Sequence, residues 1–151
     1  MPFLSLHTPI GELSLAEEQG FIVSLDWGWG SIQDPSPVLE ETKKQLIAYF
    51  KGELREFDVP LKPQGSSYRQ KVWKALQSIP FGETRSYKDI ASVAGGSPRS
   101  VGGANARNPI PILIPCHRVV SYQGLGGYSG GDGIETKKYL LNLERHFSFV
   151  P

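Results

Sequence analysis

Apolar and polar residues alternate near the start of the chain, in three short runs that span residues 3–7, 12–16 and 21–25. Turn-forming residues separate these runs, first Pro9-Ile10-Gly11 and then Glu18-Gln19-Gly20. Alternation with a period of two is typical of β-strands that bury one face, and short turns join such strands in antiparallel order. The pattern therefore predicts a three-stranded antiparallel sheet.

The period then changes to that of a helix. Apolar side chains recur at helical spacing in residues 38–51, and Gly52 is a typical helix stop. These side chains are Leu39, Leu46, Ile47 and Phe50. Residues 57–65 are rich in proline and indicate a linker. We therefore expect residues 1–64 to form a supporting lobe that packs a helix on the sheet, and residues 65–151 to form a second domain.

The second domain is predicted to be mostly helical, with helices over residues 68–78, 86–94, 98–106 and 134–145. The middle two are short and are joined by Gly95-Gly96-Ser97, which is the pattern of a helix-turn-helix. Serines precede these helices and favour N-caps, and Pro98 occupies the favoured first position. The fold class predicted from these elements is α/β, of the α+β kind.

Small residues interrupt the second helix of this pair, at Gly102-Gly103-Ala104. Glycine lowers helix stability by up to about 1 kcal/mol relative to alanine, so the glycines need a reason. One reason is tight packing against the neighbouring cysteine segment, and the other is close approach to DNA. Arg99 and Arg107 flank the glycines and favour the second interpretation.

The single cysteine of the chain, Cys116, follows an apolar run over residues 110–114. We expect this run to be a buried strand that Pro115 ends, so that Cys116 lies at a rigid and accessible turn. A thiol reacts as its thiolate, and His117 and Arg118 provide a base and a positive charge next to it in sequence. A lone cysteine is also commonly a small buried apolar residue, so chemistry alone leaves both interpretations open.

Composition and charge narrow the class of protein. One cysteine excludes an internal disulfide and indicates a reducing compartment, and no apolar run approaches the length of a membrane span. The net charge is only +1. However, residues 68–118 carry eight basic and two acidic side chains, whereas residues 1–67 carry five basic and ten acidic ones. The middle of the chain is therefore the candidate face for a polyanion, and the alternative is that these charges form an ordinary solvated surface.

The sequence Ile-Pro-Cys-His-Arg-Val-Val at residues 114–120 resembles the active-site signature of the O6-alkylguanine-DNA alkyltransferases, and the similarity extends over residues 81–145. The resemblance implies a DNA repair protein that flips O6-alkylguanine, and as a further option O4-alkylthymine, out of duplex DNA. The alkyl group would pass irreversibly and stoichiometrically to Cys116, without a cofactor or a metal ion. It implies a monomer in solution, with cooperative binding to DNA as an option, located in the cytoplasm, or in the nucleus of a eukaryote.

The resemblance also implies a role for each residue at a matching position. Cys116 would accept the alkyl group, His117 would deprotonate it through a bound water, and Glu144 would orient His117. Asn108 would hold the turn around the cysteine, and Tyr87 would rotate the phosphate and hydrogen-bond the base. The substrate-binding residues would be Tyr128, Ser129, Val119, Lys137 and Pro111. The DNA-binding residues would be Arg99, Gly102, Gly103, Ala104 and Asn105, with Arg99 filling the space of the flipped nucleotide.

Three other functions remain as alternatives. A non-catalytic sensor of alkylated bases would bind the lesion without reacting, but such sensors lack the cysteine. A helix-turn-helix regulator would need base-reading side chains, of which the glycine-rich helix has few. A cysteine hydrolase generally takes its histidine from a distant part of the chain, unlike the adjacent Cys116 and His117.

Overall fold

The N-terminal sheet has the predicted form in the computed structural model, which describes residues 1–148. Strands β1 (Phe3–Thr8), β2 (Gly11–Glu18) and β3 (Phe21–Trp27) lie in the antiparallel order β1-β2-β3. Leu4 lies opposite Leu15 in the register of β1 and β2. Both leucines are buried, because alternation gives each strand one apolar face. The prediction of a three-stranded antiparallel sheet is confirmed.

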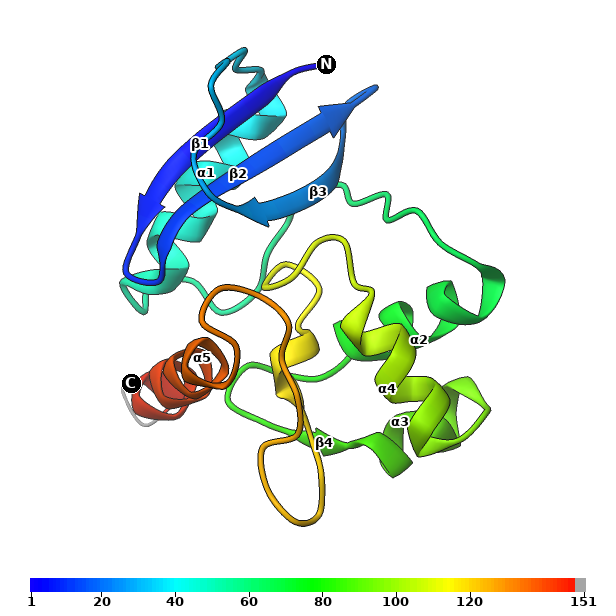
Figure 1. The fold of residues 1–151 in the computed structure, drawn as a ribbon. Helices are drawn as coiled ribbons and strands as arrows, with labels where there is room; N and C mark the ends of the chain where they lie inside the picture. Colours follow the sequence, from blue (N-terminus) through cyan, green and yellow to red (C-terminus); the bar gives the residue numbers. More distant parts are fainter. Residues whose placement is uncertain (149–151) are drawn as a thin grey trace.

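Helix α1 (Pro37–Phe50) packs on this sheet, as Figure 1 shows. Its N-cap is Ser36, whose side chain accepts a hydrogen bond from the amide of Leu39. Four side chains three or four residues apart are fully buried: Leu39, Thr42, Leu46 and Tyr49. The prediction that Ile47 belongs to the apolar face is wrong, since it is 36% exposed. The buried row includes Tyr49 instead, and this difference affects the site described below.

Helices α2 (Ser67–Gln77), α3 (Tyr87–Ala94) and α4 (Pro98–Ala106) pack against one another on the other side of the molecule (Figure 1). Each begins at a serine whose side chain accepts a backbone amide, as predicted; these N-caps are Ser66, Ser86 and Ser97. Gly95 and Gly96 have φ angles of +91° and +80° and form the tight turn between α3 and α4. The predicted pair of short helices with a glycine turn is confirmed.

The segment before the cysteine differs from the prediction. Residues 110–114 do not form a strand, because the amide of Ile114 donates to the carbonyl of Ile110 within a local turn. Ile112 has a φ of +73°, and prolines at positions 109, 111 and 115 leave few amides for a strand ladder. The apolar side chains are buried nonetheless, so their pattern reported burial and not strand geometry.

The cysteine itself begins a short 3₁₀-helix, η1 (Cys116–Arg118). The next strand, β5 (Val119–Val120), pairs in parallel with β4 (Arg85–Ser86). The last helix, α5 (Ile134–Ser148), is longer than the predicted 134–145. The final three residues of the predicted second domain, 149–151, lie outside the described residues.

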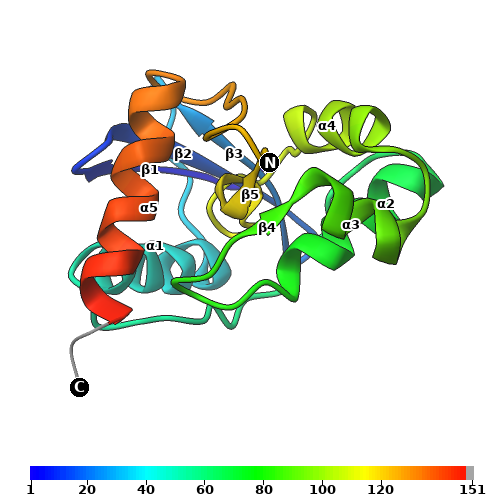
Figure 2. The same ribbon diagram turned by 90° about the horizontal axis from the view of Figure 1, so that it is seen from below.

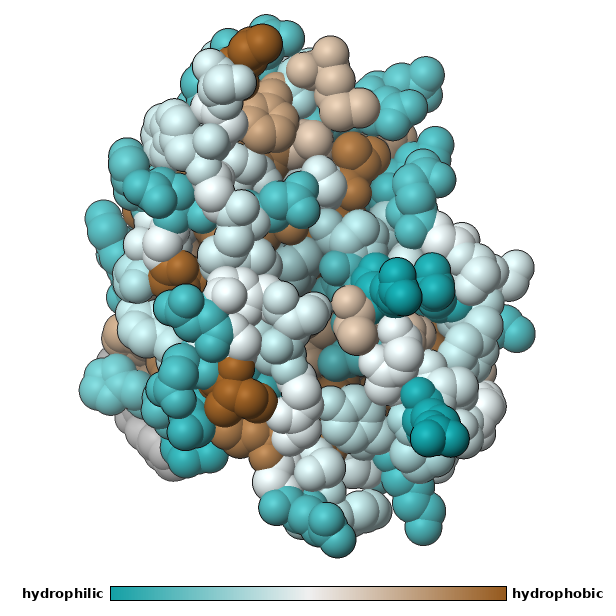
Figure 3. All heavy atoms as spheres, viewed as in Figure 1, coloured by the Kyte–Doolittle hydropathy of each residue, from teal (hydrophilic) through white to brown (hydrophobic). Residues whose placement is uncertain are grey.

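The cysteine segment lies at the centre of the molecule. Figures 1 and 2 show it (yellow) between α5 and the sheet on one side and helices α2–α4 on the other. The buried apolar side chains of the sheet, of α1 and of the helices after residue 65 form one cluster. On the face in Figure 3, apolar atoms lie in small separate groups, and strongly hydrophilic atoms gather over α4. This arrangement holds the cysteine between two rigid layers.

Candidate active site

The turn that presents Cys116 is held by two asparagine side chains. Asn108 donates from Nδ2 to the carbonyl of Ile114 at 2.8 Å and accepts at Oδ1 from the amide of Ile110 at 3.0 Å. Asn105 donates from Nδ2 to the carbonyl of Cys116 at 3.2 Å. The thiol-bearing residue is only 5% exposed, so it can move little relative to these contacts. The contacts of Asn108 agree with its predicted role at the turn.

His117 and Glu144 form a buried pair next to the cysteine. His117 Nε2 lies 2.6 Å from Glu144 Oε2, and neither side chain is more than 1% exposed. A carboxylate only accepts hydrogen bonds, so Nε2 carries the hydrogen and Nδ1 keeps a free lone pair. The buried Nδ1 has no hydrogen-bond partner in the described structure. His117 is therefore oriented as a base with its accepting nitrogen available.

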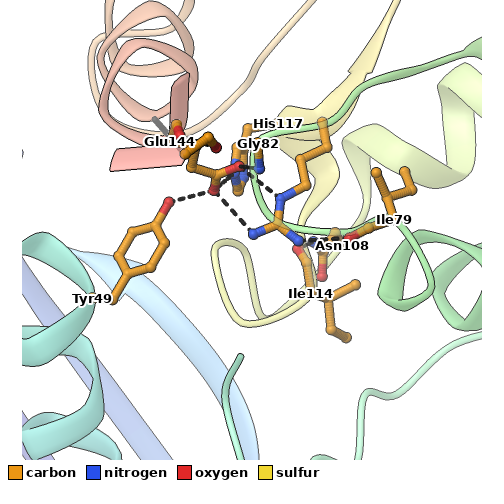
Figure 4. Close-up of polar contacts among 9 residues, drawn as sticks. Tyr49, Ile79, Gly82, Asn108, Ile114, His117 and Glu144 are labelled. Atoms are coloured by element: carbon orange, nitrogen blue, oxygen red, sulfur yellow. Dashed lines mark hydrogen bonds and ion pairs between the residues drawn. The ribbon is translucent and has the colours of Figure 1, made fainter. Parts of the chain in front are cut away.

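Glu144 accepts hydrogen bonds from three further groups, which Figure 4 shows converging on its carboxylate. Arg118 donates from Nε to Oε1 at 2.8 Å and from a terminal nitrogen to Oε2 at 3.0 Å. Tyr49 donates its hydroxyl to Oε2 at 2.6 Å, and the amide of Gly82 donates to Oε1 at 3.3 Å. Burial would raise the pKa of Glu144, but His117 and Arg118 lower it to about 2. The carboxylate is thus ionised at neutral pH.

The position of Arg118 corrects the expectation that its charge lowers the pKa of the thiol. Its guanidinium is turned to Glu144 and to the carbonyl of Ile79, at 2.7 Å. The cation that favours the thiolate of Cys116 is instead Lys137. Residues adjacent in sequence can point in different directions on a 3₁₀-helix, and here the carboxylate of Glu144 attracts the guanidinium.

Lys137 is fully buried and donates from Nζ to the carbonyls of Val119, at 2.7 Å, and Gly127, at 3.1 Å. It therefore joins α5, the cysteine segment and the glycine-rich loop of residues 125–133, and its contact with the substrate stays a prediction. Burial lowers the pKa of Lys137 to about 8. Burial likewise raises the pKa of Cys116 to about 11 and lowers that of His117. In the resting protein the cysteine is a thiol beside a neutral imidazole.

Cys116 borders two cavities. The first, of about 240 Å³, lies between α4 and the glycine-rich loop; it is lined by Tyr87, Gly102, Asn105, Ala106, Cys116, Gly127, Tyr128 and Ser129. The second, of about 170 Å³, reaches toward β3 and includes Pro111, Asn108, Trp27 and Tyr128 in its wall. Tyr128 and Ser129 line both cavities. Three of the predicted substrate-binding residues, Tyr128, Ser129 and Pro111, thus line cavities that border the thiol, whereas Val119 and Lys137 line neither.

The predicted DNA-binding residues divide between two sides of α4. Arg99 and Gly103 are exposed, and Gly102 is half-buried beside Tyr87. Ala104 and Asn105 face the interior, where they are 3% and 7% exposed. The carbonyl of Ala104 accepts a hydrogen bond from the indole of Trp73, and Asn105 holds the cysteine turn. Both residues thus have internal contacts, Asn105 also lines both cavities beside Cys116, and their contact with DNA stays a prediction.

Two residues of the site were missed in the sequence or given another role. Tyr49 lies in the lobe to which only packing was assigned, and Arg118 was expected to act on the thiol. The available signal for Tyr49 was its helical spacing from Leu39 and Leu46, which buries the phenol and requires a partner for its hydroxyl. That spacing does not identify the partner.

Comparison with known proteins supports the resemblance along the whole chain. A model described as "6-O-methylguanine DNA methyltransferase, ribonuclease-like domain" matches residues 3–63, and one described as "6-O-methylguanine DNA methyltransferase, DNA binding domain" matches residues 67–146. A constitutive methylated-DNA–protein-cysteine methyltransferase of Bacillus subtilis is 46% identical over 95% of this chain and 94% of its own length. The corresponding protein of Methanosarcina barkeri is 44% identical over 93% of this chain and 95% of its own.

Solved structures agree. The O6-methylguanine methyltransferase of Mycobacterium tuberculosis superposes with a TM-score of 0.87 at 41% identity, covering 99% of this chain and 96% of that one. An O6-methylguanine DNA methyltransferase of Methanococcus jannaschii gives a TM-score of 0.68 at 30% identity, covering 94% and 93%. Given these matches and the cysteine site between its two cavities, the chain belongs to the 6-O-methylguanine DNA methyltransferase family.

Proposed function

We propose that this protein repairs DNA by moving the alkyl group of O6-alkylguanine onto Sγ of its own Cys116. The observation that carries the proposal is the position of the thiol, which borders an approximately 240 Å³ cavity and adjoins a base with a free nitrogen. Its relatives are named methylated-DNA–protein-cysteine methyltransferases, and a 42% identical relative has been solved in complex with DNA. Because a thioether is not cleaved again at this site, each molecule reacts once.

The proton of the thiol has a route to His117. With a pKa of about 11, Cys116 needs a base, and the neutral imidazole supports that role with Nδ1 as the acceptor through a bound water. Glu144 fixes the tautomer and stabilises the imidazolium that forms. Lys137 favours the thiolate that remains. The sulfur becomes nucleophilic only when the proton leaves, which limits side reactions.

The transfer is a single displacement at the alkyl carbon. Sγ of Cys116 forms a bond to that carbon while the bond from the carbon to O6 breaks, and the electron pair stays on the guanine. The guanine then takes up a proton, and Tyr87, which lines the same cavity, carries a hydroxyl that is a suitable donor. Burial raises the pKa of Tyr87, so its hydroxyl is protonated at neutral pH and can donate to the departing guanine.

The cavity also implies how DNA is bound. A base inside a duplex cannot reach a thiol that is 5% exposed, so the alkylated base must be flipped out of the stack. The exposed Arg99 would fill the space it leaves, with Gly102 and Gly103 letting α4 approach the backbone. We propose that the protein acts as a monomer that can bind DNA cooperatively, in the cytoplasm or, in a eukaryote, the nucleus.

Among the described residues no helix is long and apolar enough to cross a membrane, and no three metal-binding side chains are grouped to hold an ion. His117 takes the proton of the thiol and Tyr87 gives a proton to the guanine; the two residues then return to their neutral forms by exchanging protons with solvent.

The test is the intact mass of the protein after mixing with a short duplex that contains O6-methylguanine. We expect wild type to gain the mass of one methylene unit, at one equivalent per molecule, and the adduct to map to Cys116. Cys116→Ser should bind the duplex without gaining mass. Tight binding by wild type with no mass change would contradict the transfer and indicate a lesion sensor.

A further inference from the structure

Tyr49 brings the N-terminal lobe into contact with the reacting groups. Its hydroxyl lies 2.6 Å from Glu144 Oε2, the same oxygen that accepts the hydrogen bond from His117 Nε2. Tyr49 and Glu144 are 95 residues apart in the sequence; Tyr49 belongs to α1 and Glu144 belongs to α5. Figure 4 shows the phenol of Tyr49 pointing toward the carboxylate of Glu144. The hydroxyl and the imidazole therefore compete for one oxygen.

The hydroxyl has no freedom to leave this position. Tyr49 is fully buried, and its ring is enclosed by three aromatic rings at centroid distances of 5.2, 5.2 and 6.0 Å. These rings are Phe50, Phe57 and Phe81. Burial, and then the negative charge of Glu144, raise the pKa of Tyr49 well above its ordinary value, so the phenol remains a donor. The hydrogen bond from this fixed phenol therefore partly neutralises the charge of the Glu144 carboxylate at all times.

We infer that Tyr49 is a positioning residue that sets the basicity of His117 by withdrawing charge from Glu144. A carboxylate oxygen that accepts an additional hydrogen bond stabilises a nearby imidazolium less, because part of its charge is already neutralised. Removing the hydroxyl should therefore make His117 a stronger base. The inference rests on the proposed relay from Cys116 to His117, and extends it into the lobe that was expected only to support.

The other charged groups around this pair do not replace Tyr49. Glu144 faces Arg118 from η1 and the amide of Gly82, and His117 is also influenced by Lys137 from α5. Arg118 divides its hydrogen bonds between both carboxylate oxygens and the carbonyl of Ile79. Tyr49 is an uncharged donor to Oε2 that is not part of the His117 ring, so its removal changes the field at His117 without removing a charge.

The direct test is to measure the pKa of His117 in DNA-free protein. The NMR signals of its ring nitrogens, recorded as a function of pH, report this pKa. In Tyr49→Phe, which keeps the ring, we expect the pKa of His117 to rise by about half a pH unit. The acid limb of the alkyl-transfer rate should move to higher pH by the same amount, because a protonated imidazole cannot accept the thiol proton. At a fixed pH on that limb the rate should fall about threefold.

Two matched changes make the test specific. Tyr139→Phe removes a hydroxyl from an exposed position of α5 and should leave both the His117 pKa and the rate unchanged. Replacing Tyr49 alone by 3,5-difluorotyrosine keeps the packing and strengthens the donor, so the pKa of His117 should fall. This arm gives a result even if Tyr49→Phe does not fold.

An unchanged pKa of His117 in folded Tyr49→Phe, or a shift in the same direction with difluorotyrosine, would overturn the inference and leave Tyr49 as a purely structural link. A shifted pKa of His117 together with a transfer rate that does not depend on pH would instead overturn the proposed proton transfer from Cys116 to His117. The role of Tyr49 in setting the basicity of His117 would then stand, so the two failures are distinguishable.

Discussion

Glu144 illustrates what a single residue contributes and why its partners are hard to find in the sequence. Its side-chain partners lie 26, 27 and 95 residues away along the chain. The motif around Cys116 marks His117, because the two are adjacent in the sequence. The motif cannot show that Arg118 turns away from the thiol, or that Tyr49 reaches the carboxylate. Those contacts form only when α1, η1 and α5 come together.

The ionised Glu144 predicts a specific loss of stability in acid. Its pKa is about 2 in the folded protein and 4.5 for an unperturbed glutamate, so its contribution is complete above pH 4.5 and is lost as the pH falls toward 2. We expect the free energy of unfolding of wild type to fall over this interval by up to about 3 kcal/mol more than that of Glu144→Gln. Denaturant titrations at several pH values measure the difference.

The exposed carboxylate of Glu135 provides the control for this prediction. Glu135→Gln should lose stability in acid in parallel with wild type, since an exposed group gains little from folding. If Glu144→Gln also follows wild type in parallel, the carboxylate of Glu144 is not the group whose ionisation stabilises the fold.

At the scale of elements, local caps and regular alternation predicted the structure well, whereas a continuous apolar run did not. The N-caps Ser66, Ser86 and Ser97 were predictable, because a cap depends on residues within one turn. The apolar run at 110–114 was read as a strand, because burial is common to strands and to compact turns. The positive φ of Ile112 and the missing amides of the prolines decide between a strand and a compact turn. A pattern of apolar residues does not report either feature.

The glycines of α4 give a prediction that separates packing from DNA contact. A Cβ built at Gly103 has no atom within 4 Å, and one at Gly102 meets only Tyr87, at 3.9 Å. Packing therefore does not require glycine at position 103. We expect Gly103→Ala to raise the free energy of unfolding by up to about 1 kcal/mol, through helix propensity, and to weaken DNA binding by about tenfold. Thermal melts and binding titrations measure the two effects.

Asn142→Ala is the matched control, because Asn142 is exposed on α5 and the change also favours a helix. It should leave DNA binding unchanged. Unaltered DNA binding in Gly103→Ala would mean that this face of α4 does not approach the duplex closely.

At the scale of the whole molecule, the active site is shared by parts that the sequence assigned to separate roles. The cysteine segment lies between α2–α4 on one side and the sheet with α5 on the other, as Figure 2 shows. The N-terminal lobe contributes Tyr49 to the buried network and Trp27 to the wall of the second cavity. The predicted division at residue 64 describes the composition of the chain, and the site depends on contacts across it.

This arrangement predicts what repair does to the stability of the protein. Cys116 is 5% exposed between two cavities whose shared wall contains Tyr128, and Tyr128 packs edge-on against Trp27 at 6.2 Å. An alkyl group on sulfur must occupy this space, and overpacking costs about 1–3 kcal/mol. We expect the methylated protein to melt about 2–4 °C below the unmodified one, and the benzylated protein lower still, because a benzyl group must displace Tyr128.

Melting curves after stoichiometric reaction with O6-methylguanine DNA or with free O6-benzylguanine measure these shifts. Cys116→Ser treated in the same way should melt as before, which separates the covalent change from bound guanine. Because Tyr128 touches both the glycine-rich loop and β3, its displacement should also loosen the contact between the lobes, and amide exchange in β3 should accelerate with the larger alkyl group. A benzylated protein that melts at or above the unmodified temperature would mean that the two cavities already accommodate the product.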